Sequence, residues 1–306
     1  MKALVVLAAL CGCAASNETQ THAEGLSLPP ELKPPLYRFE PFTLEGVRRY
    51  ADQGVDLLSP DGPGTKWMYR AVYDLQIDIM EYLLEKGRKA NDLIFAETPS
   101  LWWIAYHSGI SKGDQTRAVE LLLQHGANID FASTFEEGDT PLHAIVEYGN
   151  PKLAALLIER GADKEAVNDR GETPLFKAME MLRRYKYDGV VKNDAMIKSL
   201  IEEGCDTETA CRRNVTPLHI AAFVGRTDLA KAMLGAKKYS DVVTVDRQTP
   251  LHVATLTRTN SQMVRLLLKA GADPNLRDVS NERPLDIAER KNFIELVQIL
   301  RSVTGR

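Results

Sequence analysis

One four-residue motif recurs along this 306-residue chain at nearly constant spacing. Thr-Pro-Leu-His begins at Thr140, Thr216 and Thr249, and weaker copies begin at Thr173 and Arg283. The steps from 140 to 173 and from 216 to 249 are 33 residues, and the step from 249 to 283 is 34. A fixed period of this length is typical of solenoids, in which each repeat packs against its neighbours. The step from 173 to 216 is 43 residues, so this repeat has an insertion, near 183–193.

The residues of each repeat favour two helices separated by a tight turn. Thr is a good N-cap, and Pro suits the first helical position, which needs no amide hydrogen. Gly149 and Gly225 are placed to end a short first helix. Leu153, Leu156 and Leu157 follow at the spacing of one buried helical face. Each repeat is therefore predicted to be a helix–turn–helix.

Diverged copies extend the pattern toward the N-terminus. Ser100-Leu101-Trp102-Trp103 takes the place of the motif in one repeat, and residues 66–75 followed by 79–87 have the same layout. Residues 43–58 resemble a single capping half-repeat. The pattern predicts about six full repeats with capping elements over 39–306, with atypical repeats at the ends as solenoids require.

This period and motif resemble those of the ankyrin-repeat family, over most of residues 40–306. The resemblance implies an all-α solenoid of stacked helix–turn–helix repeats with hairpin-like loops. It also implies that the motif residues are structural, and that the histidines link adjacent loops through hydrogen bonds. The residues concerned are Thr140, His143, Thr173, Thr216, His219, Thr249 and His252.

The same resemblance implies where a partner binds. In ankyrin proteins the loop tips and exposed positions of the first helix contact the partner, just before the motif Thr and seven or eight residues after it. The chain has these residues there: Tyr73, Asp74, His107, Asp139, Glu147, Tyr148, Glu172, Glu180, Met181, Val215, Phe223, Val224, Gln248, Leu256 and Thr257.

Two groups among these positions suggest the chemistry of the partner. Glu136, Glu137 and Asp139 place three carboxylates on one loop, and Phe223, Val224 and Leu256 are apolar. If the apolar three are exposed, they form an anchor with an acidic rim, as in protein interfaces. The pattern then predicts a groove for a partner with a basic surface and an apolar protrusion. The alternative is that these three are buried against a neighbouring helix.

The N-terminus has the pattern of an export signal. Residues 1–15 combine one Lys, an apolar run over 3–10 and small residues, and the run is too short to span a bilayer. Leu10-Cys11-Gly12-Cys13 resembles a bacterial lipobox, which predicts lipidation of Cys13; cleavage near Ala15 is the alternative. Residues 16–38 are polar with two Pro-Pro pairs, which favours a flexible tether.

Beyond the signal the chain has two cysteines, Cys205 and Cys211. They are too few for a disulfide framework. They either pair with each other in an oxidising compartment or remain as two semi-buried thiols in a loop.

The composition weighs against several other functions. The 38 basic and 42 acidic residues give a net charge of −4, whereas nucleic-acid binding needs a clustered basic excess. The basic and aromatic segment 183–192 is better interpreted as a protein-binding protrusion than as an RNA contact. Metal-ligand, Walker, Rossmann and Gly-x-Ser-x-Gly motifs are missing from the sequence. We therefore expect no enzyme activity, no metal and no cofactor.

The sequence thus predicts a monomeric binding module on the periplasmic side of a bacterial envelope, touching the membrane only through a lipid anchor, or else secreted. The partner is a protein. A concrete form of this hypothesis is an inhibitor or immunity protein that sequesters a secreted toxin. The alternatives are a structural adaptor of envelope complexes and a secreted effector that acts in a host cell.

Overall fold

A computed structural model describes residues 42–60, 62–95, 98–107, 114–134, 137–148, 150–184, 194–236, 239, 241–258 and 260–304. They fall into two compact units, one ending at Asp169 and one beginning at Arg170. The predicted signal peptide with Cys13, the tether 16–38 and residues 185–193 of the insertion lie outside the described residues. Each unit is a stack of helix pairs, as the repeats predicted.

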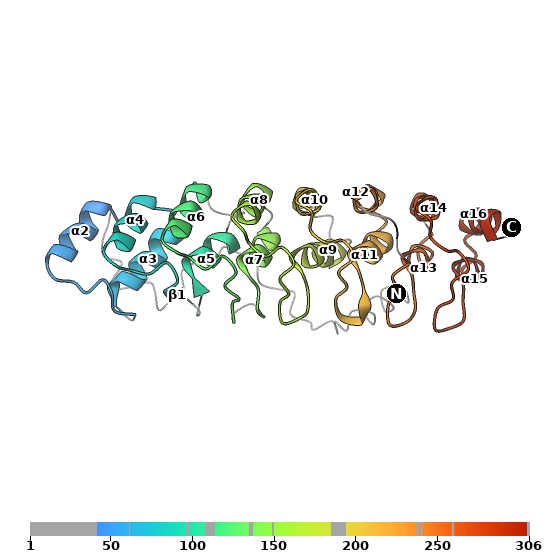
Figure 1. Cartoon of the computed structure of the whole chain (residues 1–306), viewed down its shortest axis with the longest axis horizontal. Helices are drawn as coiled ribbons and strands as arrows, with labels where there is room; N and C mark the ends of the chain where they lie inside the picture. The colour runs from blue at the N-terminus through green and yellow to red at the C-terminus, as the bar shows by residue number, and fades with distance from the viewer. Residues whose placement is uncertain are drawn as a thin grey trace. The chain divides into compact units, whose positions relative to one another are not determined.

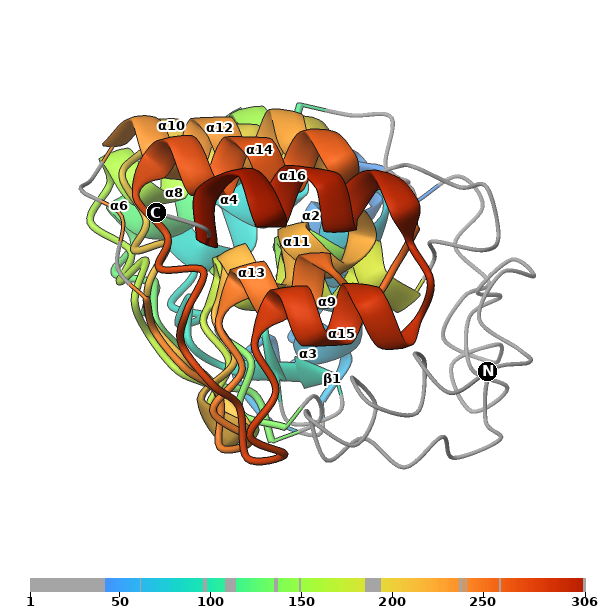
Figure 2. The same ribbon diagram turned by 90° about the vertical axis from the view of Figure 1, so that its right-hand side faces the viewer.

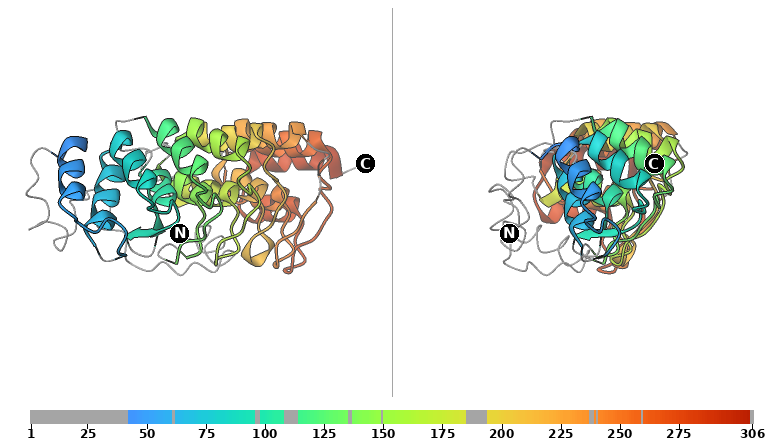
Figure 3. Two further views of the ribbon diagram at one scale, coloured as in Figure 1. Left: turned by 60° about the vertical axis from the view of Figure 1, so that its left-hand side comes forward. Right: turned by 90° about the vertical axis from the view of Figure 1, so that its left-hand side faces the viewer.

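The first unit has three helix pairs and one additional helix (Figures 1 and 3). Its first helices pack in one layer and its second helices in another. The first layer contains α3 (Pro63–Tyr73), α5 (Ser100–Tyr106) and α7 (Pro141–Tyr148). The second contains α2 (Leu44–Asp52), α4 (Ile77–Glu85), α6 (Gln115–Gln124) and α8 (Pro151–Glu159). Since α2 packs on α4, it takes the place of a second helix at the end of the stack.

One loop of the first unit forms a short hairpin. Strand β1 (Leu93–Phe95) pairs antiparallel with β2 (Thr98–Pro99), and β2 leads directly into α5. Among the described residues this is the only sheet, which agrees with the all-α fold predicted from the repeats.

The second unit has four helix pairs, again arranged in a layer of first helices and a layer of second helices, which Figure 2 shows nearly end-on. The first helices are α9 (Pro174–Arg184), α11 (Pro217–Val224), α13 (Pro250–Ala254) and α15 (Pro284–Arg290). The second helices are α10 (Asp194–Glu202), α12 (Thr227–Ala236), α14 (Ser261–Ala270) and α16 (Ile294–Thr304). A single 3₁₀ turn, η3 (Arg212–Asn214), lies in the loop before α11. The described residues therefore form seven helix pairs, where the sequence pattern had suggested about six full repeats with capping elements.

The motif residues cap the first helices. The hydroxyls of Thr216 and Thr249 accept hydrogen bonds from the amides three residues on, and Pro217 and Pro250 begin their helices. Thr173 accepts in the same way from the amide of Phe176, at 3.2 Å. These contacts satisfy amides that an uncapped helix leaves without a partner.

A residue in the left-handed region follows two of the first helices, α11 and α3. Gly225 follows α11 with φ 83°, a conformation that glycine adopts without steric cost. Leu75 takes the equivalent place after α3 with φ 50°, which is strained for a side chain with a Cβ. The turn is thus kept where the sequence lacks glycine.

The diverged repeat at α5 has a different register from the one the sequence suggested. The motif was placed at Ser100-Leu101-Trp102-Trp103, with Trp103 in the histidine position. In the structure Pro99 is the N-cap and Ser100 the first helical residue, so Leu101 is buried like Leu142 and Trp102 takes the histidine position. The predicted motif register was wrong by one residue, because Thr98-Pro99 belongs to the hairpin before α5 and not to the helix.

Candidate protein-binding surface

The motif histidines of the second unit join each repeat to the next. The Nε2–H of His219 donates to the carbonyl oxygen of Gln248 at 3.0 Å, and that of His252 donates to Glu282 at 3.2 Å. In each case Nδ1 accepts from the hydroxyl and the amide of the motif Thr, Thr216 or Thr249. His143 makes the same contacts with Thr140 in the first unit. These side chains act in the scaffold.

Burial keeps the rings of His219 and His252 neutral. His219 is fully buried, and this lowers its pKa to about 4, while its backbone hydrogen bond raises the pKa and the nearby His252 lowers it further. Burial likewise lowers the pKa of His252. A neutral imidazole can accept on Nδ1 while it donates from Nε2, and this is the protonation state that the loop contact requires.

Asp139, predicted to lie in an exposed acidic rim, is buried. Its main-chain oxygen accepts from Trp102 Nε1 and from the Ser133 amide, both at 2.9 Å. Its carboxylate accepts from Asn168 Nδ2 at 2.8 Å. The side chain therefore fixes the loop, and the expected exposure of this carboxylate was wrong. Of its two loop partners, Glu137 is exposed and Glu136 lies outside the described residues.

The other predicted contact residues differ in exposure. Those buried are His107, Glu172, Glu180, Val215, Phe223, Gln248 and Leu256. Those half-buried are Tyr73, Met181, Val224 and Thr257, and Asp74 is exposed. The side chains of Glu147 and Tyr148 lie outside the described residues.

The burial of the largest of these residues has local causes. Glu180 holds Arg183 through two carboxylate oxygens at 2.7–3.1 Å, so both turn inward on α9. Phe223 and Leu256 are only 2% and 6% exposed, so the burial alternative holds for both and they are not a ready apolar anchor.

Two of the exposed apolar side chains lie instead at loop tips. In the second unit Val245 and Val279 are 54% and 60% exposed, and each stands four residues before the N-cap of its helix. Their loops are joined by main-chain hydrogen bonds, from Val245 to Arg213 at 2.9 Å and from Val279 to Asp246 at 3.0 Å. We call Val245, Asp246 and Val279 the loop-tip strip.

The strip has charge of both signs. Arg213 and Asp246 form an ion pair at 2.9 Å between successive loops, and Arg247 is exposed beside them. The apolar tips are therefore surrounded by a mixed polar rim, which is the general anatomy of a protein interface. This differs from the wholly acidic rim that the sequence suggested.

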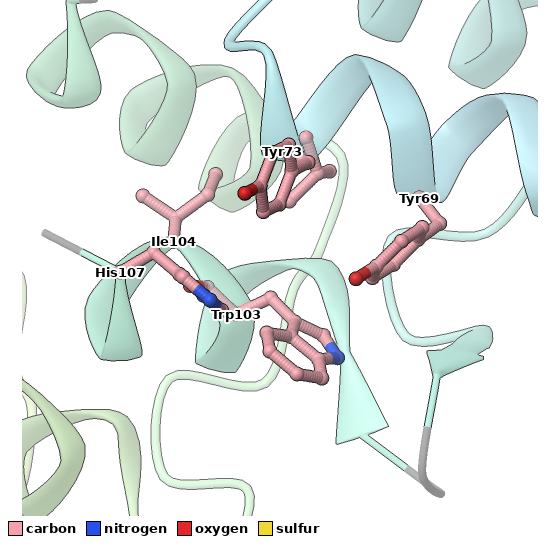
Figure 4. Close-up of a pocket in the computed structure, with 6 residues that line it drawn as sticks. Tyr69, Tyr73, Trp103, Ile104 and His107 are labelled. Carbon is pink, nitrogen blue, oxygen red and sulfur yellow. The ribbon is translucent and has the colours of Figure 1, made fainter. Parts of the chain in front are cut away.

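A second feature, in the first unit, is a small pocket lined by aromatic residues (Figure 4). Tyr69, Val72 and Tyr73 come from α3, Trp103 and Ile104 come from α5, and His107 is the C-cap residue of α5. Two of the predicted contact residues, Tyr73 and His107, thus lie together, with ring centroids 5.7 Å apart. Burial lowers the pKa of His107, and its Nδ1 lies 3.2 Å from the Trp103 carbonyl oxygen.

Comparison with known families agrees with this architecture. A family described as "Ankyrin repeats (3 copies)" matches residues 101–192 and 186–278, which is more than half of the chain. The chain belongs to the ankyrin-repeat family. In general this family consists of non-enzymatic interaction modules, so this ankyrin-repeat protein is a protein-binding module.

Similar proteins include several named as inhibitors. NF-kappa-B inhibitor zeta of Mus musculus is 28% identical over 267 residues, covering 75% of this chain and 35% of the relative. NF-kappa-B inhibitor delta of Mus musculus is 28% identical over 194 residues, covering 57% of this chain and 59% of the relative. The E3 ubiquitin-protein ligase KEG of Arabidopsis thaliana is 26% identical over 252 residues, covering 79% of this chain and 15% of the relative. The ankyrin-repeat chain spans about a third of the length of the zeta inhibitors that it matches.

The sequence interpretation missed the loop-tip strip. A signal was present, because valine occupies the same position of two successive repeats where other repeats have Glu136, Asp169 or Arg212. The expected contact positions lay just before the motif Thr and seven or eight residues after it, so in these two repeats they did not include the position four residues before it.

The two cysteines beyond the signal segment are both thiols. Cys205 is buried and Cys211 is half-buried. The described residues hold no metal-binding cluster of His, Cys, Asp and Glu, and none of their helices could cross a bilayer.

Proposed function

We propose that this ankyrin-repeat protein is an exported binding protein that sequesters a protein partner through the loop-tip strip of its second unit. The observation that carries this proposal is the exposure of Val245 and Val279 at equivalent tips of adjoining loops. Covering the exposed part of each valine would contribute on the order of 1 kcal/mol to binding. Neither valine packs into the core, so folding gives no reason for them.

The strip is also well ordered for binding. Main-chain hydrogen bonds and the Arg213–Asp246 ion pair hold each loop to the next. A surface that is already held in place loses little conformational entropy when a partner covers it. The ion pair is about one-third exposed, so its value to stability is small and its main effect is on the position of the loops.

The export signal and the inhibitor role belong to the same proposal. Residues 1–15 have the pattern of a signal peptide, and Cys13 is the residue expected to carry lipid. The names of the NF-kappa-B inhibitor relatives support an inhibitory mode of binding. We therefore propose a lipid-anchored inhibitor or immunity protein that blocks a secreted toxin or an envelope enzyme.

Affinity capture of the full chain from the envelope fraction of its own cells tests the binding surface. We expect one dominant partner, retained by the wild type and lost in a Val245→Asp, Val279→Asp double variant. Ile294→Asp is the matched control, because Ile294 is 67% exposed on α16, in the layer away from the loops (Figure 2). A double variant that is folded and still retains the partner would refute this surface.

Fractionation tests the anchor separately. Wild-type protein should pellet with membranes, and Cys13→Ala should be released into the soluble fraction or remain unprocessed. Equal distribution of the two forms would overturn lipidation without affecting the binding surface. An activity assay of the captured partner, with and without the ankyrin-repeat protein, then distinguishes an inhibitor from an adaptor.

A further inference from the structure

Arg247 stands at the tip of the loop before α13, in a backbone conformation that suits glycine. Its φ is 57°, in the left-handed region, where a side chain with a Cβ is strained. Four other repeats have φ between 58° and 76° at the same position, two residues before the first motif residue. There the residue is glycine or asparagine, which adopt this conformation most readily: Gly138, Gly171, Asn214 and Asn281. Folding alone therefore gives no reason for an arginine at this tip.

The guanidinium of Arg247 is not used within the fold. Its side chain is exposed, and no carboxylate in the described part of the chain forms an ion pair with it. The neighbouring carboxylate of Asp246 pairs instead with Arg213 of the preceding loop, at 2.9 Å. A residue that strains its backbone and gains no ion pair in return is a candidate for binding.

The carboxylates of the next loop are already engaged. Oδ1 of Asp278 accepts from the amides of Ser280 and Glu282, at 2.8 and 3.1 Å. Both carboxylate oxygens of Glu282 accept from Arg290, at 2.7 and 2.8 Å. These contacts leave the positive charge of Arg247 unbalanced at the loop tips.

Arg247 also lies beside both exposed valines. Val245 is two residues before it, and the amide of Val279 donates at 3.0 Å to the main-chain oxygen of Asp246, the residue that precedes Arg247. The loops of the second unit extend away from the layer of second helices, so their tips are open to a partner (Figure 1). A guanidinium offers a fixed fork of donors that matches a carboxylate, and the valines offer apolar surface next to it.

We propose that the loop-tip strip takes an acidic segment of its protein partner. An Asp or Glu of the partner pairs with Arg247, and an apolar side chain next to that carboxylate covers Val245 and Val279. This inference rests on the proposed function, because it names the chemistry of the partner that the strip binds. It reverses the sign expected from the sequence, which predicted a partner with a basic surface. A nucleic acid fits poorly, since phosphate binding needs a clustered basic excess.

Selection from a phage library of random linear peptides tests this chemistry with a defined probe. The library is panned on the full chain, and clones that also bind a Val245→Ser, Val279→Ser double variant are removed. Serine is neutral, so the subtraction itself does not select for charge. The peptides that remain depend on the strip. We expect them to be enriched in Asp or Glu next to a large apolar residue, and to be poor in Lys and Arg.

Arg247→Asn then separates a role in binding from a role in the fold. Equivalent tips already have asparagine, at Asn214 and Asn281, so the variant should melt at the same temperature as the wild type or higher. Fluorescence anisotropy with a selected peptide should show about tenfold weaker binding, as expected for a lost charge-assisted hydrogen bond, and a weaker dependence on salt. Arg265→Gln is the matched control, because Arg265 is exposed on α14, in the layer of second helices, and its loss changes the net charge equally.

The inference is overturned if the strip-dependent peptides are neutral or basic, or if Arg247→Asn binds them as tightly as the wild type does. Either result leaves the strip as a binding surface for a partner of different chemistry, so the proposed function stands. If instead no selected peptide depends on Val245 and Val279, the strip is not a binding surface, and the proposed function and the inference fail together.

Discussion

The indole nitrogen of Trp102 donates a hydrogen bond to the main-chain oxygen of Asp139, 2.9 Å away. This contact reproduces the ones that His219 and His252 make with Gln248 and Glu282. In each case a ring N–H from one first helix reaches the residue just before the next helix N-cap. Tryptophan and histidine can therefore make the same contact between repeats, provided that the ring N–H reaches the carbonyl oxygen of the residue before the next N-cap.

Trp102→Phe should lower the free energy of unfolding of the first unit by about 1 kcal/mol. The phenyl ring keeps most of the apolar burial but loses the donor, while the Ser133 amide still bonds to the same oxygen. Urea unfolding followed by circular dichroism measures the change. An unchanged unfolding midpoint would mean that the indole contact adds nothing to stability.

The repeat period predicted the fold well, because each helix pair combines its own cap and buried face with a fixed spacing. Thr216 and Thr249 cap their helices as expected, and Gly225 and Gly271 end helices in the left-handed region. Register in the diverged repeats was harder to predict. Trp102 could not be recognised as a histidine substitute, because only the distance to Asp139 reveals the shared donor.

The binding surface was predicted less well, since exposure depends on how neighbouring repeats pack. Phe223 and Leu256 occupy positions that face outward in a generic repeat, yet both are buried here. Periodicity within one repeat does not report this, because burial also depends on packing against neighbouring repeats. Val245 and Val279 are exposed because they stand at loop tips, where no later element covers them.

Acid should destabilise the second unit through His219. Its pKa is about 4 in the folded protein and about 6.5 in an unfolded chain, so the folded state favours the neutral ring. The associated stability is fully present above pH 6.5 and is lost as the pH falls from 6.5 to 4. The loss should reach about 3 kcal/mol, since one pKa unit corresponds to about 1.4 kcal/mol.

Urea unfolding of wild type and His219→Gln at several pH values tests this. The variant should be less stable at pH 7.5 and should have a flatter profile between pH 6.5 and 4. Some slope will remain, because burial also lowers the pKa of His252 and His107. Parallel profiles for the two proteins would exclude His219 as a source of the acid sensitivity.

Substitutions at two glycines allow the cost of a left-handed backbone to be measured apart from the cost of a steric clash. Gly225 and Gly271 both have positive φ, at 83° and 105°. A Cβ at Gly225 would lie 2.6 Å from Oδ1 of Asn260, whereas a Cβ at Gly271 would have no atom within 4 Å. The buried Asn260 side chain donates to the carbonyls of Ala222 and Ala254 at 2.8 and 3.2 Å, so a displacement would break a bridge between repeats.

Gly271→Ala should therefore cost about 1 kcal/mol, from the left-handed backbone alone. Gly225→Ala should cost at least about 1 kcal/mol more, because it also disturbs buried hydrogen bonds. Thermal unfolding of the two variants side by side gives the comparison. Equal losses would show that Asn260 moves aside without cost.

Arg88 clamps the loop between the first two helices of the first unit. Its side chain is almost fully buried, and Nη1 donates to the carbonyls of Leu58 and Ser59, both at 3.2 Å. Arg88→Lys should lower the stability of this unit by about 1–3 kcal/mol, because the lysine ammonium lacks the forked guanidinium donors and leaves the part-buried carbonyls of Leu58 and Ser59 without this hydrogen bond. Lys89→Met, at an exposed neighbouring position, should change stability by less than about 0.5 kcal/mol. If hydrogen exchange in α2 and α3 is no faster in Arg88→Lys than in the control, the loop is held by packing alone and the guanidinium is dispensable.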